Sequence, residues 1–451
     1  MKKTLFQKVL CLILSVTTLL GIFAFTASAS EGKRGTNRDT ASSLADMNEL
    51  VGVSSYEQYL AGFAGEAENK GCDVIEIDVV NDRELSESNS FTVAEAREIE
   101  AKLNNGAKLS ELSEKEQEIY KAIGSSIGWE NLGEDTDEYL YLPATGETTW
   151  NFRVDDGAAT FYYIRIEYYS CEASTSSIST IERKLLIDGS APFKEASYVN
   201  FSKTWVFDYV IEGEPVPTTE ANRTDVKYEY RTVTINGKQR EAYCKVVTTV
   251  KDGYKTETLY AIPQDINENS MLPEIDPVAQ WNTYYCQDST GFTEGFLQFY
   301  LFNGPHTFTL VAEREPVVIK SIDLIPVDYT EDEQINREIG LPSYAETLAY
   351  YQQMGYTAAP NDVNNALLKI EAEFPDLVSD SAVYPTNDKT SSATYPSKPN
   401  AQVYNVIGEN SYSALGQWAA YTFTVNQSGL YKFGMRYKQS ALQGMYICRA
   451  I

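Results

Sequence analysis

Very little in this chain points to catalysis. Its single histidine, His306, lies in a Gly-Pro-His-Thr-Phe context with no nucleophile motif around it. The sequence also lacks a Gly-rich phosphate loop, zinc-ligand spacing and a Gly-x-Ser-x-Gly elbow. With 64 acidic residues, pairs of the kind that glycosidases use arise by chance, and none stands in a recognisable catalytic motif. We therefore predict that the protein is not an enzyme, with polysaccharide hydrolysis as the weakest alternative.

Cysteines and long apolar runs are also scarce. Of the six cysteines, five follow the N-terminal apolar run, an odd number without a CxxC pair, which argues against a disulfide framework. The only long apolar run, Val9–Phe25, follows Lys2, Lys3 and Lys8 and precedes an Ala-Ser-Ala site. This pattern predicts a signal peptide over 1–29, a secreted chain and no membrane span in the mature protein.

Positive charge is the other deficit. The chain carries 37 basic and 64 acidic residues, and removing the three signal lysines gives the mature protein a net charge of −30. Nucleic acid would be repelled by such a surface. Calcium, neutral sugars and cationic partners remain compatible with it.

What the chain does contain is an internal repeat. The stretch from Ser55 (SYEQYLA, VIEID, FRV, YYIRIEYY) returns from Ser343 as SYAETLA, KIEAE, FTV and YKFGMRY. The matched pairs include Tyr56/Tyr344, Leu60/Leu348, Ile75/Ile370, Glu76/Glu371, Phe152/Phe423, Val154/Val425, Tyr162/Tyr431, Tyr168/Tyr437 and Arg183/Arg449. A repeat of this length indicates a folding module that is followed by an incomplete second copy.

Strand and helix signals give the fold class. Strands are predicted at 150–154, 161–169, 181–187, 203–211, 295–302, 306–312 and 317–325, and this spacing is typical of a β-sandwich. Helical capping boxes start at Thr92 and Ser113 and predict an inserted helical hairpin. Asn236-Gly237 predicts a two-residue hairpin turn. The fold is therefore expected to be mainly β.

These signals divide the chain into successive parts. We expect a signal peptide at 1–29, a disordered lead-in at 30–50, a first β-sandwich module with its lead-in helix at 51–328, a helical linker at 329–360 and an incomplete second module at 361–451. The first module is predicted to carry two insertions, helical at 91–128 and a β-hairpin at 218–262 that decorates the sandwich.

The strings FYYIRIEYY, IERKLLIDGSAPFKEA, GFTEGFLQFYLFNGPHTFTLVAEREPVVIKSIDL and GLYKFGMRYKQSALQGMYICRAI resemble the N-terminal region of large extracellular solute-binding proteins of Gram-positive sugar ABC transporters. The resemblance covers roughly residues 50–451. It implies galactose-binding-like jelly rolls, a cell-surface or secreted location, carbohydrate as partner and an ABC permease reached through a further C-terminal part. The two-lobed solute-binding part of that family has no counterpart in this sequence.

The modules also resemble calcium-containing carbohydrate-binding jelly rolls of families 6 and 35. In those proteins an opening strand that reads like IEAE and a closing strand with an Asp hold a structural ion. The resemblance implies a Ca²⁺ site with the ligands Glu76, Asp78 and Asp323 in the first copy and Glu371 and Glu373 in the second. The alternative is a solvated strand face in an acidic protein, although Asp323 interrupts an apolar face and so requires a partner.

Sugar binding needs aromatic faces beside hydrogen-bonding groups. Trp205, Trp281, Tyr284 and Tyr285 are the candidates, because they lie near predicted strand ends and loops. For each of them packing is the alternative role. We thus expect a secreted, non-catalytic carbohydrate-binding protein, and the alternative is a structural spacer or protein-docking module at the cell surface.

Overall fold

The computed structural model describes residues 52–66, 69–85, 89–123, 132, 139–171, 180–208, 210–235, 237–288, 293, 295–328, 343–358, 368–413, 417–425 and 428–438. The signal peptide and lead-in predicted at 1–50 lie outside these ranges, as does Arg449 of the repeat. Within them, no helix is both long enough and apolar enough to cross a membrane.

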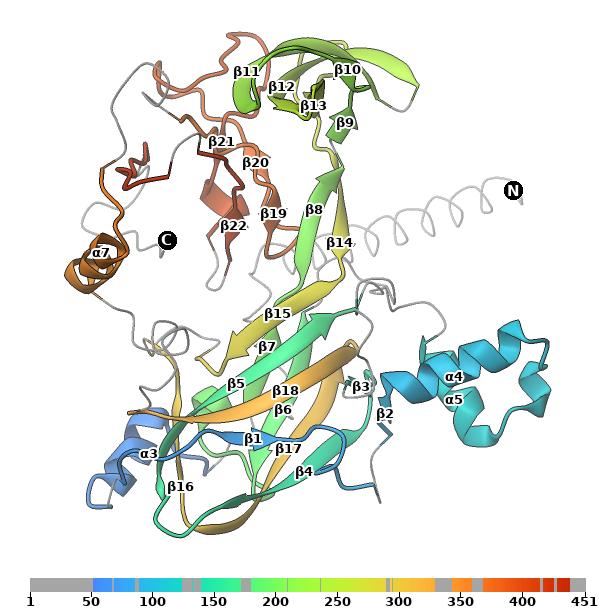
Figure 1. Ribbon diagram of the computed structural model, residues 1–451, viewed down its shortest axis with the longest axis vertical. Coiled ribbons are helices and arrows are strands. Elements are labelled where there is room, and N and C mark those ends of the chain that lie inside the picture. Colours follow the sequence, from blue (N-terminus) through green and yellow to red (C-terminus); the bar gives the residue numbers. More distant parts are fainter. Residues whose placement is uncertain are drawn as a thin grey trace, which may run out of the picture.

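The predicted mainly β fold is confirmed, with a β-sandwich at one end of the molecule (Figure 1). One sheet contains β1 Ile75–Ile77, β2 Phe91–Thr92, β3 Leu140–Leu142, β5 Thr160–Ser170, β15 Gln280–Tyr285, β16 Gln298–Leu301 and β18 Val317–Pro326. The second has the order β4 Glu147–Val154, β17 Gly304–Arg314, β6 Ile181–Ile187 and β7 Tyr198–Phe201. All pairings between the strands of these two sheets are antiparallel.

The core of the sandwich follows from side-chain alternation. In β4 the residues Thr148, Trp150, Phe152 and Val154 are buried, whereas Glu147, Asn151 and Arg153 are exposed. A period of two puts one set of side chains on the inner face, where they meet the inner faces of β5, β17 and β18. The Trp150 indole Nε1 donates to the carbonyl of Val79 at 2.8 Å, which satisfies its only polar atom.

The opening and closing strands of the module lie side by side, as the sequence predicts. β1 pairs antiparallel with β18 in the register Ile75↔Leu324, Glu76↔Asp323 and Ile77↔Ile322. The first strand is therefore held by the last one. This contact brings the two predicted metal-ligand segments of the first copy together.

The helices are α3 Tyr56–Phe63, α4 Val93–Asn104, α5 Glu114–Ile123 and α7 Tyr344–Gln353. Both predicted capping boxes of the inserted hairpin are present, at Thr92 with Glu95 and at Ser113 with Glu116. The hairpin projects from the sandwich and packs Val93, Ala96 and Ile99 against its edge (Figure 1).

Residues 210–263 form a separate curved sheet at the far end of the molecule (Figure 1). It contains β9 Val210–Glu212, β10 Val216–Pro217, β11 Arg223–Ile235, β12 Lys238–Lys251 and β13 Tyr254–Pro263. Ile235 pairs with Lys238 and Gly237 has a φ of 73°, as the predicted two-residue turn requires. We call the unit β11–β13 the meander.

The meander is not a decoration on the sandwich, which corrects the expectation for 218–262. Its Tyr243 and Ile262 pack against Phe374 of the C-terminal segment, and Lys245 Nζ lies 3.0 Å from an Asp376 carboxylate oxygen. One set of its side chains, Tyr228, Tyr230, Tyr243 and Ile262, packs with Phe374 and Tyr404. A second set, Val233, Ala242, Cys244, Val246 and Ala261, forms a core of its own with Ile211 and Leu259.

In the described part of residues 368–438 the strands are all short: β19 Leu377–Val378, β20 Pro385–Thr386, β21 Val406–Ile407 and β22 Ala419–Ala420. β19 joins β22 to β8 Thr204–Asp208, which pairs on its other side with β14 Glu274–Val278. The described part of the second copy is thus built onto strands of the first half of the chain and does not form a sandwich of its own.

Candidate functional site

The predicted ion site of the first copy is closed by an arginine. Asp323 is 5% exposed, and its Oδ2 accepts from Arg165 Nε at 3.0 Å and lies 3.0 Å from Arg165 Nη2. Ser321 Oγ donates to the same oxygen at 3.2 Å. Burial raises the pKa of Asp323 more than the guanidinium lowers it. The partner that a buried carboxylate requires is therefore Arg165.

The other two predicted ligands, Asp78 and Glu76, do not form an ion site with Asp323. Asp78 follows the end of β1, and its Oδ1 accepts from the backbone N–H groups of Val80 and Asn81 at 3.0 and 2.8 Å. Asn81 Nδ2 donates to Oδ2 at 2.7 Å, and this hydrogen bond is the main reason for the lowered pKa of Asp78. Glu76 is exposed opposite Asp323. Asp78 thus caps a turn instead of sharing a strand face with Glu76.

The second copy presents a different arrangement. Glu373 is 1% exposed, and its Oε1 has no hydrogen-bond partner among the described residues. Burial, followed by the charge of Glu371, raises the pKa of Glu373 to about 8. Glu371 pairs with Lys369, and its backbone N–H donates to the Tyr228 hydroxyl of the meander at 3.2 Å.

The internal repeat explains why the two copies differ. Aligning Tyr162 with Tyr431 and Tyr168 with Tyr437 places Gly434 at the position of Arg165. The second copy therefore has no arginine at the position of Arg165, the residue that pairs with Asp323 in the first copy. Among the described residues no three His, Cys, Asp or Glu side chains form a group that could hold a metal ion. Glu371 and Glu373 with nearby carbonyls are the donor set that the second copy offers.

The four aromatic residues proposed for sugar binding do not meet. Trp205 (3% exposed) packs with Phe207 and Val378, and Tyr284 (7%) lies in the sandwich core. Tyr285 (9%) stacks on Phe296 with ring centroids 4.6 Å apart. Burial leaves these three without a face for a ligand, so their role is packing.

Trp281 is half-buried on β15. Its ring lies 4.8 Å from that of Tyr139 and 5.4 Å from that of Tyr169, and Lys320 Nζ is 6.0 Å from its centroid. It is the one member of the predicted set with partial solvent access, and no other member lies beside it in its cluster.

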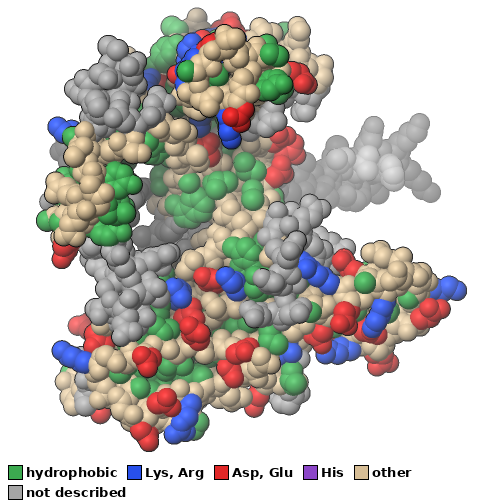
Figure 2. Space-filling model, in the orientation of Figure 1, with side chains coloured by type: hydrophobic (Ala, Val, Ile, Leu, Met, Phe, Trp, Pro, Cys, Tyr) green, Lys and Arg blue, Asp and Glu red, His purple; other side chains and the backbone are tan. Residues whose placement is uncertain are grey.

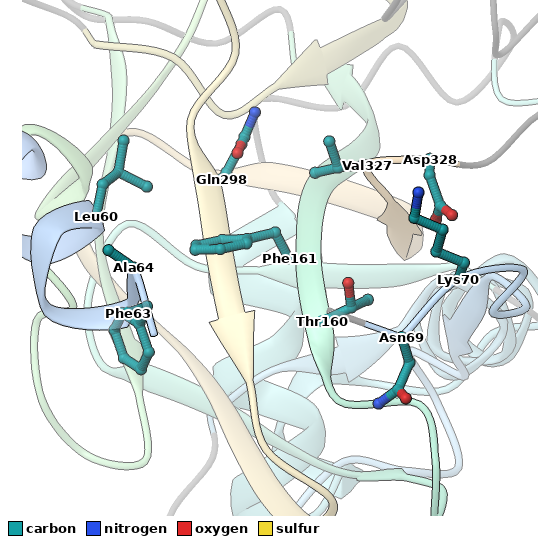
Figure 3. Close-up of a pocket in the computed structure, with 10 residues that line it drawn as sticks. All are labelled: Leu60, Phe63, Ala64, Asn69, Lys70, Thr160, Phe161, Gln298, Val327 and Asp328. Carbon is teal, nitrogen blue, oxygen red and sulfur yellow. The ribbon is translucent and has the colours of Figure 1, made fainter. Parts of the chain in front are cut away.

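A concave site lies instead where α3 meets the sandwich. This cavity, which we call the α3 pocket, has a volume of about 250 Å³ and is lined by Leu60, Phe63, Ala64, Asn69, Lys70, Thr160, Phe161, Gln298, Val327 and Asp328. Figure 3 shows Phe161 between Leu60 and Ala64 of α3 on one side and Lys70 with Asp328 on the other.

Packing of α3 fixes the aromatic wall of the pocket. The Tyr56 hydroxyl accepts from Gln298 N at 3.0 Å and the Tyr59 hydroxyl from Tyr300 N at 2.8 Å, which locks the helix onto β16. Phe63 then stacks on Tyr300 at 4.8 Å and meets Phe161 edge to face at 6.3 Å. These contacts within the protein position the rings of Phe63 and Phe161.

Polar side chains reach the α3 pocket from the segment before β1 and from the segment after β18. Asp328 follows β18, and its Oδ2 accepts from Gly71 N at 3.3 Å. Asn69 Nδ2 donates to the Ala159 carbonyl at 2.8 Å, while Gln298 Nε2 donates to the Tyr163 hydroxyl at 3.2 Å. None of these residues is among the sequence-based site candidates. One usable signal is present in the sequence, since Lys70 and Asp328 lie next to the opening and closing strands, which are expected to be neighbours.

No family model, no curated protein and no solved structure matches this chain. The arrangement of its own side chains is therefore the basis for any functional assignment.

Proposed function

We propose that the protein is a secreted, non-catalytic carbohydrate-binding protein at a Gram-positive cell surface, and that the α3 pocket is its sugar site. The observation that carries the proposal is the half-buried Phe63 ring beside Lys70 and Asp328 around one cavity, with the buried Phe161 forming part of its wall. Aromatic rings pack against the apolar face of a sugar ring, and carboxylate and ammonium groups bind its hydroxyls.

The size of the cavity restricts the ligand. About 250 Å³ lies below the roughly 300 to 1,000 Å³ of typical ligand pockets, so one ring fits and a bound chain would extend outward. The protein would then recognise the terminal residue of a glycan. By resemblance to sugar-transport solute-binding proteins, such capture would serve an ABC permease through a part that this sequence does not contain.

Binding should depend on the exposed polar groups of the α3 pocket. We expect Asp328→Ala to weaken retention of the mature chain on its best neutral polysaccharide in affinity electrophoresis by about tenfold or more, since a charged hydrogen bond contributes roughly 1.5 to 3 kcal/mol. Glu98→Ala, an exposed acidic residue on α4, has the same charge change and is the matched control. Retention by no polysaccharide, or equal retention of the two variants, would refute the assignment.

We also propose that a structural Ca²⁺ binds in the second copy rather than the first. Glu371 and Glu373 would hold it, and the ion would supply a positive charge beside the buried Glu373 carboxylate. The unpartnered Glu373 Oε1 and the mutual charge effect of the two glutamates fit a hard divalent cation with oxygen ligands.

Calcium affinity should rise with pH, because the pKa of Glu373 is raised to about 8 and the ligand must lose its proton. By calorimetry we expect close to tenfold tighter binding of Ca²⁺ at pH 7 than at pH 6, loss of binding in Glu373→Gln and unchanged binding in Asp78→Asn. If Asp78→Asn loses the ion instead, the site lies at β1; if no heat appears at pH 8, there is no site.

A spacer or protein-docking role is the second candidate. It is favoured by one observation, the exposed apolar side chains Phe423, Phe433, Met435 and Tyr437 on the second copy. Exposed apolar side chains of this number are typical of interaction sites.

A further inference from the structure

Residues 432–438 lie outside the described helices and strands and carry aromatic and apolar side chains that are exposed to solvent. Phe433, Met435 and Tyr437 are 66%, 58% and 76% exposed and alternate with Lys432, Gly434 and Arg436. Within the described ranges, residues 432–438 make no backbone hydrogen bond to another strand. We call this segment the open strand.

The first module shows what covers these positions in a complete sandwich. The repeat aligns the three apolar residues with Ile164, Ile166 and Tyr168 of β5, which are 1%, 1% and 3% exposed. β18 pairs with β5 over its length, and β17 pairs with β4, whose Phe152 corresponds to the exposed Phe423. The residues that are buried in one copy are thus exposed in the other.

The lead-in helix shows the same contrast. α3 and α7 begin with the same capping box, at Ser55 and Ser343. Tyr56 of α3 is 8% exposed because it packs on Phe193, whereas its counterpart Tyr344 is 82% exposed. Figure 2 shows hydrophobic side chains gathered over α7. In the first module the corresponding surfaces are covered, by β17 and β18 on the sheet and by Phe193 on the helix.

Charge indicates which kind of strand would fit. On the outer face of the first module, β5 and β18 are joined by Arg165 with Asp323 and by Glu167 with Lys320, at 3.0 and 2.8 Å. The open strand has Lys432 and Arg436 at outer positions, and residues 428–438 contain no acidic residue in a chain of net charge −27. Lys438 is already paired with Asp388. Cross-strand pairing therefore favours acidic side chains opposite Lys432 and Arg436.

We propose that the open strand is an acceptor for an antiparallel β-strand donated by a partner protein, and that this strand alternates apolar with acidic side chains. Its backbone would pair with 432–438, its apolar side chains would cover Phe433, Met435 and Tyr437, and its carboxylates would face the two cations. This is strand addition to a segment without a strand partner, in which main-chain hydrogen bonds give affinity and side-chain alternation gives specificity. The proposal is independent of the α3 pocket.

The test uses the mature chain and a fluorescent ten-residue peptide, the length of β18, that alternates valine with glutamate. Fluorescence polarisation should show saturable binding that weakens with added salt. The double variant Lys432→Glu/Arg436→Glu should bind at least tenfold more weakly. Lys238→Glu/Lys251→Glu, two exposed cations on the meander, makes the same charge change and should bind as the unmodified chain does.

Hydrogen exchange locates the contact and decides the remaining outcomes. Bound peptide should protect the amides of 432–438 and leave those of β5 unchanged. Equal binding of a valine–lysine peptide, no binding at all, or protection elsewhere would each overturn the proposal. So would a concentration-dependent dimer that Phe433→Lys abolishes, because the occupant would then be a second copy of the chain.

Discussion

Replacing Arg183 with methionine is expected to cost the first module about 3 kcal/mol or more of unfolding free energy. Arg183 is fully buried on β6, and its Nη1 donates to the carbonyls of Glu182 and Arg314, both at 2.8 Å. Its Nη2 donates to Leu142 and Pro143 at 3.3 and 3.2 Å. One guanidinium therefore ties the ends of β3 and β17 to β6.

The size of the effect comes from what the substitution leaves behind. Each buried carbonyl without a donor costs roughly 1 to 3 kcal/mol, and four acceptors depend on this side chain. The gain from removing a desolvated charge offsets part of that cost; burial already lowers the pKa of Arg183 to about 10. The Arg183→Lys variant should also be strongly destabilised. An ammonium group lacks the planar guanidinium geometry that reaches the carbonyls of β6, β17 and the end of β3.

Hydrogen exchange of β4 and β6 amides in the mature chain measures this free energy within the module. Arg153→Met is the matched control. Arg153 lies on β4 of the same sheet, its side chain is 59% exposed, and its contact with Asp155 is long, at 4.0 Å. Its expected cost is below about 0.5 kcal/mol. If the two variants are equally stable, the hydrogen bonds from Arg183 to the four carbonyls do not contribute to the stability of the module.

Patterns local in sequence predicted the elements well. Alternation placed β4, β5, β6, β17 and β18 close to their observed bounds, and capping boxes placed the helix starts. These features depend on neighbouring residues or on a strand period, both of which are visible in one sequence. The β1–β18 contact is implied instead by the resemblance to carbohydrate-binding jelly rolls, in which the opening and closing strands lie together.

Partners distant in sequence could not be predicted. Asp323 required a counter-charge, but no spacing rule indicates Arg165, which lies 158 positions earlier in the chain. Trp205 is expected near a strand end and a loop, but β8 is paired on both sides, with β14 and β19. Glu373 is expected to be a calcium ligand, and its burial beside Phe374, which packs on the meander, has no local signal in the sequence. In each case tertiary contacts override a local expectation.

Stability of the contact between the C-terminal segment and the meander is expected to fall as pH rises from about 4.5 to about 8, with EDTA present. The pKa of Glu373 is raised from its ordinary 4.5 to about 8 by burial and then by Glu371. In this window the folded state holds a proton that the unfolded segment has released, so stability decreases by about 1.4 kcal/mol per pH unit. Below the window both states are protonated, and above it neither is.

Glu373→Gln should remove this dependence, because a neutral amide of the same shape stands in for the protonated carboxyl at every pH. The variant is expected to equal the unmodified chain near pH 4.5 and to exceed its stability at pH 8 by several kcal/mol. Exchange of amides 374–380, corrected for intrinsic rates, measures the opening of this contact. Glu274→Gln, at an exposed position of β14, is the control and should keep the slope. A slope that persists in Glu373→Gln would assign the titration to another group, since the nearby Lys245–Asp376 pair is unchanged in both variants.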